Sequence, residues 1–291
     1  MPISPYSPRP MDQADRIYFF GTCLIDLIFP QAGLAAMRLL RREGLTVVYP
    51  QGQTCCGQPA YNSGYDAEAR TVARRQLDAF PEDFPLVVPS ASCAGMLKVQ
   101  YPKLFAGTPD QERAERLAAR VWELTDFLLR RLDWGRPDLG PPLKVVLHHS
   151  CSARREMGVA AAATALLSRL ANLEVVEPDH AYECCGFGGT FAVKQPEISA
   201  AMAADKADAI VATASQVLVS QDCGCLMNLG GTLAHRYPEA GNPMGTRPFT
   251  SLSVGQGQGF SALGKADLAS PARPPAVKHI AELLWERTHV P

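Results

Sequence analysis

Two copies of the tripeptide Cys-Cys-Gly constrain this chain more than any other feature of its sequence. They are Cys55-Cys56-Gly57 and Cys184-Cys185-Gly186. A single cysteine stands 32 or 33 positions before each pair and another stands 37 or 38 positions after it: Cys23 and Cys93 around the first pair, Cys151 and Cys223 around the second. Cys225 is the only cysteine outside this frame. Two matched frames indicate a tandem duplication.

Short apolar runs alternate with helical patterns in the same order in each half. The expected strands are residues 16–20, 45–49 and 86–88, then 144–147, 173–176 and 216–219. The expected helices are residues 30–42, 67–80 and 111–131, then 158–170, 196–212 and 277–287. This order predicts the α/β class, with two tandem repeated halves that each contain a parallel sheet and are related by a pseudo-two-fold duplication. Ligands of such sheets bind beyond the carboxyl ends of the strands, where every cysteine of the frame is expected.

Composition marks the boundaries of these halves. The proline-rich, polar residues 1–15 are expected to form a disordered arm. The first repeat is predicted to span residues 16–134 and the second residues 143–291, joined by the Gly- and Pro-rich residues 135–142. Residues 239–275 have no counterpart in the first half and lack the apolar periodicity of a core element. They are therefore predicted to be a flexible insertion in the second repeat.

Charge and hydropathy exclude several classes of protein. The formal net charge of −1 gives no general attraction to nucleic acid. No apolar run approaches the roughly 20 residues of a transmembrane helix, and the N-terminal residues lack the pattern of a signal peptide. We therefore expect a cytoplasmic protein without a transmembrane segment. Thiols stay reduced in that compartment, so the nine cysteines are candidates for metal or redox chemistry rather than for disulfides.

Thiolate sulfur is a soft ligand that suits iron–sulfur clusters and zinc. Structural zinc sites usually take ligands two to four residues apart. Adjacent cysteines project differently, and we expect the several iron atoms of a cluster to accept them more easily than one mononuclear ion does. The predicted ligands are all nine cysteines: Cys23, Cys55, Cys56 and Cys93 in the first half, and Cys151, Cys184, Cys185, Cys223 and Cys225 in the second.

Other residues near the cysteines have simpler interpretations. His148 and His149, which precede Cys151, are interpreted as strand-end packing rather than as ligands. Arg154, Arg155 and Lys194 follow cluster cysteines. Two interpretations of these cations stay open: they stabilise an anionic cluster, or they lie on the solvated surface.

Four stretches resemble the CCG-type cysteine-rich family, which includes the cysteine-rich subunit of heterodisulfide reductase and the iron–sulfur subunits of glycolate and glycerol-3-phosphate dehydrogenases. They are residues 52–64, 89–93, 184–191 and 222–228. The chain is most similar to the members that serve lactate utilization. This resemblance implies one or two iron–sulfur clusters, of the [4Fe-4S] or the non-cubane kind. It also implies electron transfer, with iron–sulfur or flavin partner proteins, in a multi-protein system that oxidises L-lactate to pyruvate.

The two halves depart differently from the fullest family motif, which ends in Cys-x-x-Cys. The first half has Met96 where the last cysteine would stand, and the second reads Cys223-Gly224-Cys225. Five thiols in the second half suit the non-cubane cluster known in the family, and four in the first suit a simpler one. Two alternatives to electron transfer stay open. One is a heterodisulfide or thiol reductase whose cluster is catalytic, and the other is a zinc-stabilised scaffold without a redox role.

Overall fold

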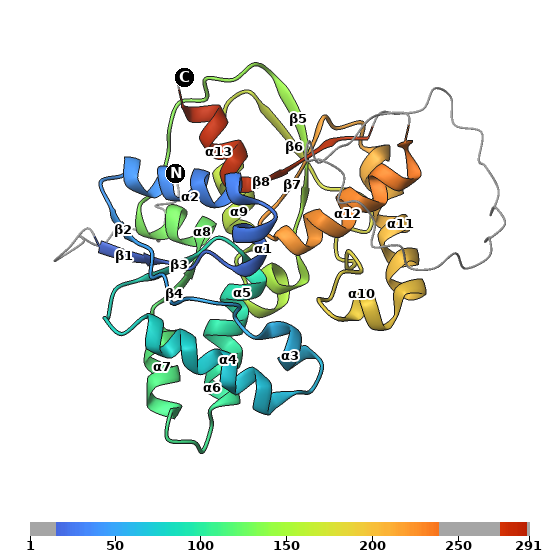
Figure 1. The fold of residues 1–291 in the computed structure, drawn as a ribbon. Helices are drawn as coiled ribbons and strands as arrows, with labels where there is room; N and C mark the ends of the chain where they lie inside the picture. The colour runs from blue at the N-terminus through green and yellow to red at the C-terminus, as the bar shows by residue number, and fades with distance from the viewer. Residues whose placement is uncertain (1–15, 239–273, 290–291) are drawn as a thin grey trace.

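The computed structural model describes residues 16–238 and 274–289 as two four-stranded parallel sheets flanked by helices (Figure 1). The predicted arm, residues 1–15, and most of the predicted insertion, residues 239–273, lie outside the described residues. Strand order is β2-β1-β3-β4 in the first sheet and β6-β5-β7-β8 in the second. Because the two orders are equivalent strand for strand, the predicted class and the duplication into two tandem halves are confirmed.

The first half alternates strands with helices from its first residue. Its elements are β1 (Arg16–Phe19), α1 (Cys23–Leu27), α2 (Pro30–Arg42), β2 (Thr46–Val48), α3 (Gln58–Asn62), α4 (Asp66–Ala79), β3 (Leu86–Val88), α5 (Ala91–Gly95), the π-helical turn η1 (Met96–Gln100), α6 (Tyr101–Leu104), α7 (Gln111–Ala119), β4 (Val121–Glu123), α8 (Leu124–Asp126) and the π-helical turn η2 (Phe127–Arg131).

The second half repeats this plan. Its elements are β5 (Leu143–His148), the π-helical turn η3 (Ser152–Glu156), α9 (Ala160–Leu167), β6 (Leu173–Val176), α10 (Phe191–Lys194), α11 (Pro196–Ala212), β7 (Val217–Ser220), α12 (Cys223–Arg236), β8 (Ala276–His279) and α13 (Ile280–Thr288). Within the described ranges, no helix has the length and apolar composition needed to cross a bilayer.

Each sheet has one strand more than we predicted. Residues 121–123, expected inside a helix, form β4, because Val121 and Trp122 pair with β3. Likewise residues 276–279 form β8 beside β7, although residues 277–279 were expected to begin a helix. In both places parallel pairing with a buried strand outweighs local helical propensity. The prediction also missed two helices that follow third strands, α5 and α12.

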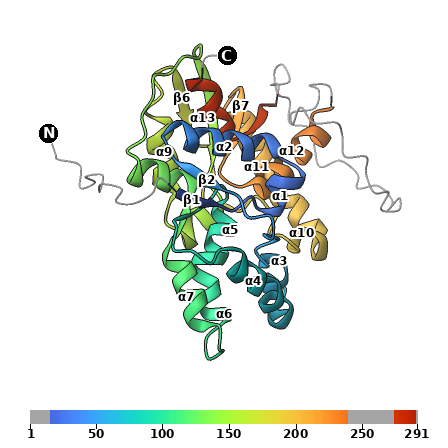
Figure 2. The ribbon, with the colours of Figure 1, turned by 60° about the vertical axis from the view of Figure 1, so that its left-hand side comes forward.

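One apolar layer lies between the two sheets. Strand side chains alternate between faces, so Ile17 and Phe19 of β1 point into this layer while Tyr18 and Phe20 face the opposite core. Four helical segments fill the layer, α2 and α8–η2 from the first half and α9 and α13 from the second. In both ribbon views α2 lies beside α13 (Figures 1 and 2). Burial on both faces explains the continuous apolar strands.

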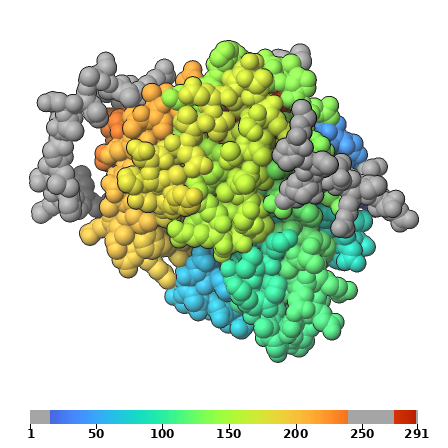
Figure 3. Space-filling view, turned by 180° about the vertical axis from the view of Figure 1, so that it is seen from behind, coloured from blue at the N-terminus to red at the C-terminus, as the bar shows by residue number. Residues whose placement is uncertain are grey.

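Separate cores cover the outer faces of the sheets. Helices α4, α6 and α7 cover the first sheet, and α11 and α12 cover the second. Helix α1 of the first half crosses to pack Ile25 against the core of the second. Seen from behind, the second half, in yellow-green to orange, meets the blue-green α3–α7 region along a continuous surface (Figure 3).

Buried polar contacts tie the halves together at the strand ends. Glu123 ends β4 and caps α8, and His279 ends β8 and caps α13. Gln221 contacts the first turn of α8 and the cap of α13. Its side chain donates to Thr125 Oγ1 at 2.8 Å, and its carbonyl accepts from His279 Nε2 at 3.2 Å. His279 Nδ1 accepts from the Ala281 N–H, so Nε2 carries the proton. These contacts place the carboxyl ends of both sheets at the interface.

The linker between halves is held by a buried ion pair. Arg287 of α13 donates twice to Asp138, at 2.8 and 2.7 Å, and the Asp138 side chain is fully buried.

We predict that Asp138→Ala lowers the free energy of unfolding by about 3–5 kcal/mol, because it leaves a buried guanidinium without its partner. Asp208→Ala, which breaks the exposed pair with Arg236, should cost about 1 kcal/mol or less. Urea unfolding measures both, and equal losses would contradict this account.

Burial raises the pKa of Glu123 to about 8, although its Oε2 accepts hydrogen bonds from Thr125 and Asp126. The unfolded chain therefore loses this proton near pH 4.5 and the folded chain near pH 8, so unfolding releases a proton between these values. Relative to Glu123→Gln, the free energy of unfolding of the wild type should fall as the pH rises through this window, by up to about 1.4 kcal/mol per pH unit. Thermal unfolding at several pH values measures it. Parallel profiles for the two proteins would refute the shift.

Candidate metal centres

The cysteines of each half gather at the carboxyl edge of its sheet, as predicted. In the first half, Cys23 begins α1 after β1, Cys55 and Cys56 follow β2, and Cys93 lies in α5 after β3. Parallel strands end at the same edge, so three segments that are distant in sequence meet there. The second half repeats the arrangement after β5, β6 and β7.

Thiols of the first half form a continuous chain of contacts. Cys23 Sγ lies 3.8 Å from Cys55 Sγ, and Cys56 Sγ lies 3.5 Å from Cys93 Sγ. The adjacent Cys55 and Cys56 side chains also interact. For comparison, two thiolates bound at about 2.3 Å to one tetrahedral ion lie about 3.8 Å apart. The four sulfur atoms are therefore close enough to bind a common metal group.

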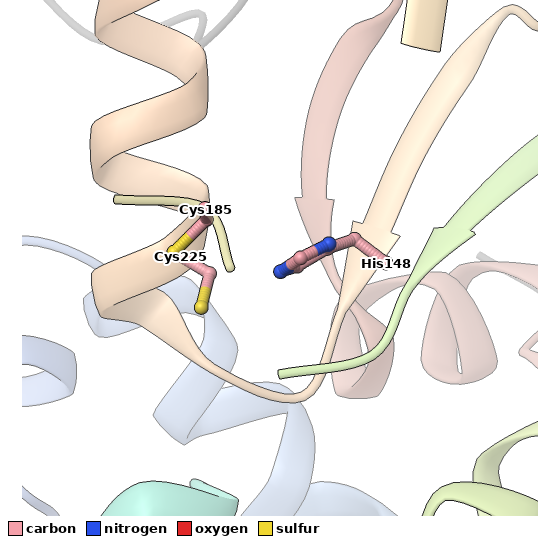
Figure 4. Close-up of side chains that lie close together, drawn as sticks. All are labelled: His148, Cys185 and Cys225. Carbon is pink, nitrogen blue, oxygen red and sulfur yellow. The ribbon is translucent and has the colours of Figure 1, made fainter. Parts of the chain in front are cut away.

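The second half contains an equivalent chain of thiols. Cys151 interacts with Cys184, Cys184 with Cys185, and Cys185 with Cys225. A histidine adds a nitrogen here: ligand atoms of His148, Cys185 and Cys225 all lie within 4.8 Å of one another (Figure 4). Each half thus presents four thiols in the same order of contact.

Cys225, not Cys223, is the structural counterpart of Cys93, which corrects the pairing read from sequence spacing. Cys93 is the third residue of α5 after the N-cap Ser90, and Cys225 is the third residue of α12 after the N-cap Asp222. The spacing misled because α11 has 17 residues where α4 has 14, and Cys225 lies three residues further from its pair than Cys93 does.

Cys223 is therefore the extra thiol, at the position of Ala91 in the first half. It is 2% exposed, and its sulfur makes no hydrogen bond within the described part of the chain. Burial raises its pKa most, followed by charges on Asp222, Glu282, Cys93 and Cys225. Cys223 thus lies near thiols of both sets, and its ligation stays a prediction.

A glycine follows each pair and directs its amide at sulfur. Gly57 and Gly186 have φ values of +86° and +81°, and each N–H donates to the first sulfur of the pair, Cys55 or Cys184, at 3.4 Å. A left-handed backbone at this position favours glycine. These amides stabilise negative charge on the sulfur atoms that they contact.

Hydrogen bonding gives each set one acidic thiol. The pKa of Cys55 is lowered because Cys23 and Cys56 donate to its sulfur, together with the Gly57 amide. The pKa of Cys184 is lowered in the same way by Cys151, Cys185 and the Gly186 amide. The thiolate is the form that binds metal. The lowered pKa therefore favours metal binding by Cys55 and Cys184.

Three cations predicted near the cluster have partners of their own. Arg154 pairs with Glu177 at 3.2 Å and lies over the Tyr182 ring. Arg155 donates to the Tyr182 carbonyl, and Lys194 lies over the ring of Tyr65.

A fourth cation near the thiols, Lys206, was not predicted from the sequence. It is 1% exposed on the apolar face of α11 and donates to the His180 carbonyl. Burial lowers its pKa, and charges on Glu183, Cys185 and Cys184 oppose this lowering. A lysine in register with Ala203, Ala207 and Ile210 was the available signal.

Asp222 joins the two sets across the interface. Its Oδ1 accepts from the Ser90 hydroxyl at 2.7 Å and the Ser92 amide at 2.9 Å, both in the segment that carries Cys93. Its Oδ2 accepts from the hydroxyl of Ser150, beside Cys151. One buried carboxyl group therefore positions cysteine segments of both halves.

Two glycines of the second loop offer a matched test of this geometry. A Cβ at Gly186 would lie 2.5 Å from the Ser199 carbonyl oxygen, whereas a Cβ at Gly189 would meet nothing within 4 Å, and both residues have positive φ. We predict that Gly189→Ala costs about 1–2 kcal/mol from the backbone alone. Gly186→Ala should cost a further 1–3 kcal/mol or so, because α11 must move. Urea unfolding measures the difference, and equal costs would refute the close packing of this loop against α11.

Comparison with known proteins agrees with this architecture. The model of the CCG cysteine-rich domain matches residues 17–98 and 145–230. Lactate utilization protein A of Geobacillus kaustophilus (strain HTA426) is 45% identical over 222 residues, covering 75% of this chain and 92% of that protein. Lactate utilization protein A 2 of Bacillus cereus (strain 03BB102) is 42% identical over 224 residues, covering 76% and 92%.

A solved structure shares the fold at low sequence identity. It is the crystal structure of a hypothetical protein from Helicobacter pylori, with a TM-score of 0.58 and 9% identity. The match covers 99% of this chain and 51% of that one. The family model matches both halves in the segments that carry the thiol sets. The chain therefore belongs to the CCG cysteine-rich domain family.

Proposed function

We propose that this chain is an iron–sulfur electron-transfer subunit of a multi-protein system that oxidises L-lactate to pyruvate. Relatives named for lactate utilization, at 42–45% identity over about three quarters of the chain, support the substrate. The duplicated chain of four contacting thiols is the observation that carries the redox role. Bound clusters would supply one-electron chemistry, which thiols and backbone alone do not.

The donors fit iron–sulfur clusters. Four cysteine thiolates are the usual ligand set of a [4Fe-4S] cluster, and each half brings four thiols into contact. In the first half these are Cys23, Cys55, Cys56 and Cys93, and in the second Cys151, Cys184, Cys185 and Cys225. The second cysteine of each pair is almost fully buried, at 2% for Cys56 and 3% for Cys185. Apolar packing around these sulfur atoms keeps water away from the centres.

Protein groups near the thiols suit an anionic cluster. The Gly57 and Gly186 amides donate to sulfur in each half, and Lys206 places a buried positive charge near Cys184 and Cys185. Hydrogen bonds and cations stabilise the reduced, more negative state of a cluster. The proximity of Cys93 in the first half to Cys223 in the second supports electron exchange between the halves.

Oxidation of lactate would require partner subunits. No nucleotide- or flavin-binding motif is visible in the sequence, so a flavin or another iron–sulfur protein would take electrons from the substrate. We propose that this chain accepts those electrons in the cytoplasm and delivers them to a further acceptor. Lactate-dependent reduction of the clusters only when the partner subunits are added would support this order.

A zinc-stabilised scaffold is the second candidate, and one observation favours it. His148, Cys185 and Cys225 place their ligand atoms within 4.8 Å of one another, and with Cys184 they would form the Cys₃His set of a structural zinc site. One stoichiometric zinc without iron or sulfide in protein purified anaerobically would support this candidate and contradict the electron-transfer proposal.

Two serine variants test the ligand assignment. Cys225→Ser should remove about half of the bound iron and acid-labile sulfide, because Cys225 closes the second thiol set. Cys223→Ser should remove less of both, since this buried thiol lies outside the chain of contacts. Metal and sulfide analysis with EPR spectroscopy measures the outcome. Loss of iron in Cys223→Ser with retention in Cys225→Ser would overturn the assignment.

A further inference from the structure

His148 is a buried polar side chain without a hydrogen-bond partner. It ends β5 and is 2% exposed. Both ring nitrogens are buried, and neither has a partner in residues 16–238 or 274–289. A buried donor or acceptor left unpaired costs free energy, so a group that satisfies one of these nitrogens is expected.

Neighbouring and equivalent positions do not share this property. His149 has partners, because its Nε2 lies 3.2 Å from Thr164 Oγ1 and 3.4 Å from Glu177 Oε1. In the first half the residue three positions before the first cysteine is Phe20, which packs against Phe80 in an apolar core. Strand-end packing thus accounts for His149 and Phe20 but not for His148.

The ring of His148 points at two thiols. In Figure 4 it extends from the end of β5 toward Cys225, at the start of α12, and Cys185. The three ligand atoms lie within 4.8 Å of one another. An imidazole nitrogen and a thiolate that share one tetrahedral metal atom lie about 3.6 Å apart. Small side-chain rotations therefore suffice for joint ligation.

We propose that His148 is a nitrogen ligand of the metal centre in the second half and shares one metal atom with Cys185 and Cys225. Only the identity of this metal as cluster iron rests on the proposed function. With His148, the second half has five donors in contact, where the first half has four thiols and an apolar Phe20. An iron atom with three protein ligands departs from the one-ligand-per-iron pattern of a cubane.

This ligand makes the two centres chemically different. The first half offers four thiols alone, whereas the second offers four thiols and a neutral imidazole, and cluster potential depends on the ligands around the iron. The two centres should therefore differ in potential. A duplicated protein would then carry two centres that are ordered in energy, which suits passage of electrons in one direction.

Nitrogen hyperfine spectroscopy tests the proposal directly. Protein labelled with ¹⁵N only at histidine is purified anaerobically, and pulsed EPR is recorded in a paramagnetic cluster state. We expect the coupling of a directly bonded nitrogen in the wild type, its retention in the control His149→Gln and its loss in His148→Phe. The last variant introduces the residue that the first half uses at this position. Absence of this coupling from wild-type protein with full iron and sulfide, or its persistence in His148→Phe, would overturn the proposal.

A cobalt titration separates this proposal from the proposed function. Protein that contains zinc and no iron would contradict the electron-transfer role while leaving histidine ligation to be tested. Metal-free protein is then titrated with Co²⁺ alone. His148→Phe should weaken Co²⁺ binding by at least about tenfold and shift its visible absorption, and His149→Gln should change neither. An unchanged titration in His148→Phe would refute ligation whatever the native metal is.

Discussion

The apolar layer between the two sheets determines where both thiol sets lie. A four-stranded parallel sheet needs cover on both faces, and each half obtains part of that cover from helices of the other. Helix α2 packs on α13, and α8–η2 and α9 fill the remainder. This exchange fixes the carboxyl ends of both sheets at one interface. The cysteine segments, which follow those strand ends, are brought together as a consequence.

Buried polar groups set the finer geometry of that interface. Asp222 accepts hydrogen bonds from Ser90, Ser92 and Ser150, so one carboxyl group orients segments beside Cys93 and Cys151. Such contacts are costly to leave unpaired, which makes them specific for one arrangement of the halves. The duplication is not symmetric here. Asp222 occupies the position in the second half that Ser90 occupies in the first, and Cys223 occupies that of Ala91. Differences between the halves are thus concentrated around the thiols.

The sequence predicted the class, the duplication and the gathering of cysteines, because the repeated Cys-Cys-Gly frame and the apolar runs are local signals. It did not predict β4 and β8, whose strand form depends on pairing with β3 and β7. It also paired Cys93 with Cys223, because spacing counts residues alone, and α11 has three residues more than α4. The proposed role of His148 was hidden for a similar reason. Only the tertiary structure places its ring against Cys185 and Cys225 and leaves both nitrogens without partners.

The central claim is that two duplicated thiol sets each hold an iron–sulfur cluster. Anomalous diffraction at the iron absorption edge, from crystals grown without oxygen, tests it most directly. We expect two separate groups of iron peaks, one within bonding distance of Cys23, Cys55, Cys56 and Cys93, and one within bonding distance of Cys151, Cys184, Cys185 and Cys225. A single peak that appears only at the zinc edge, or iron bound away from these sulfur atoms, would contradict it.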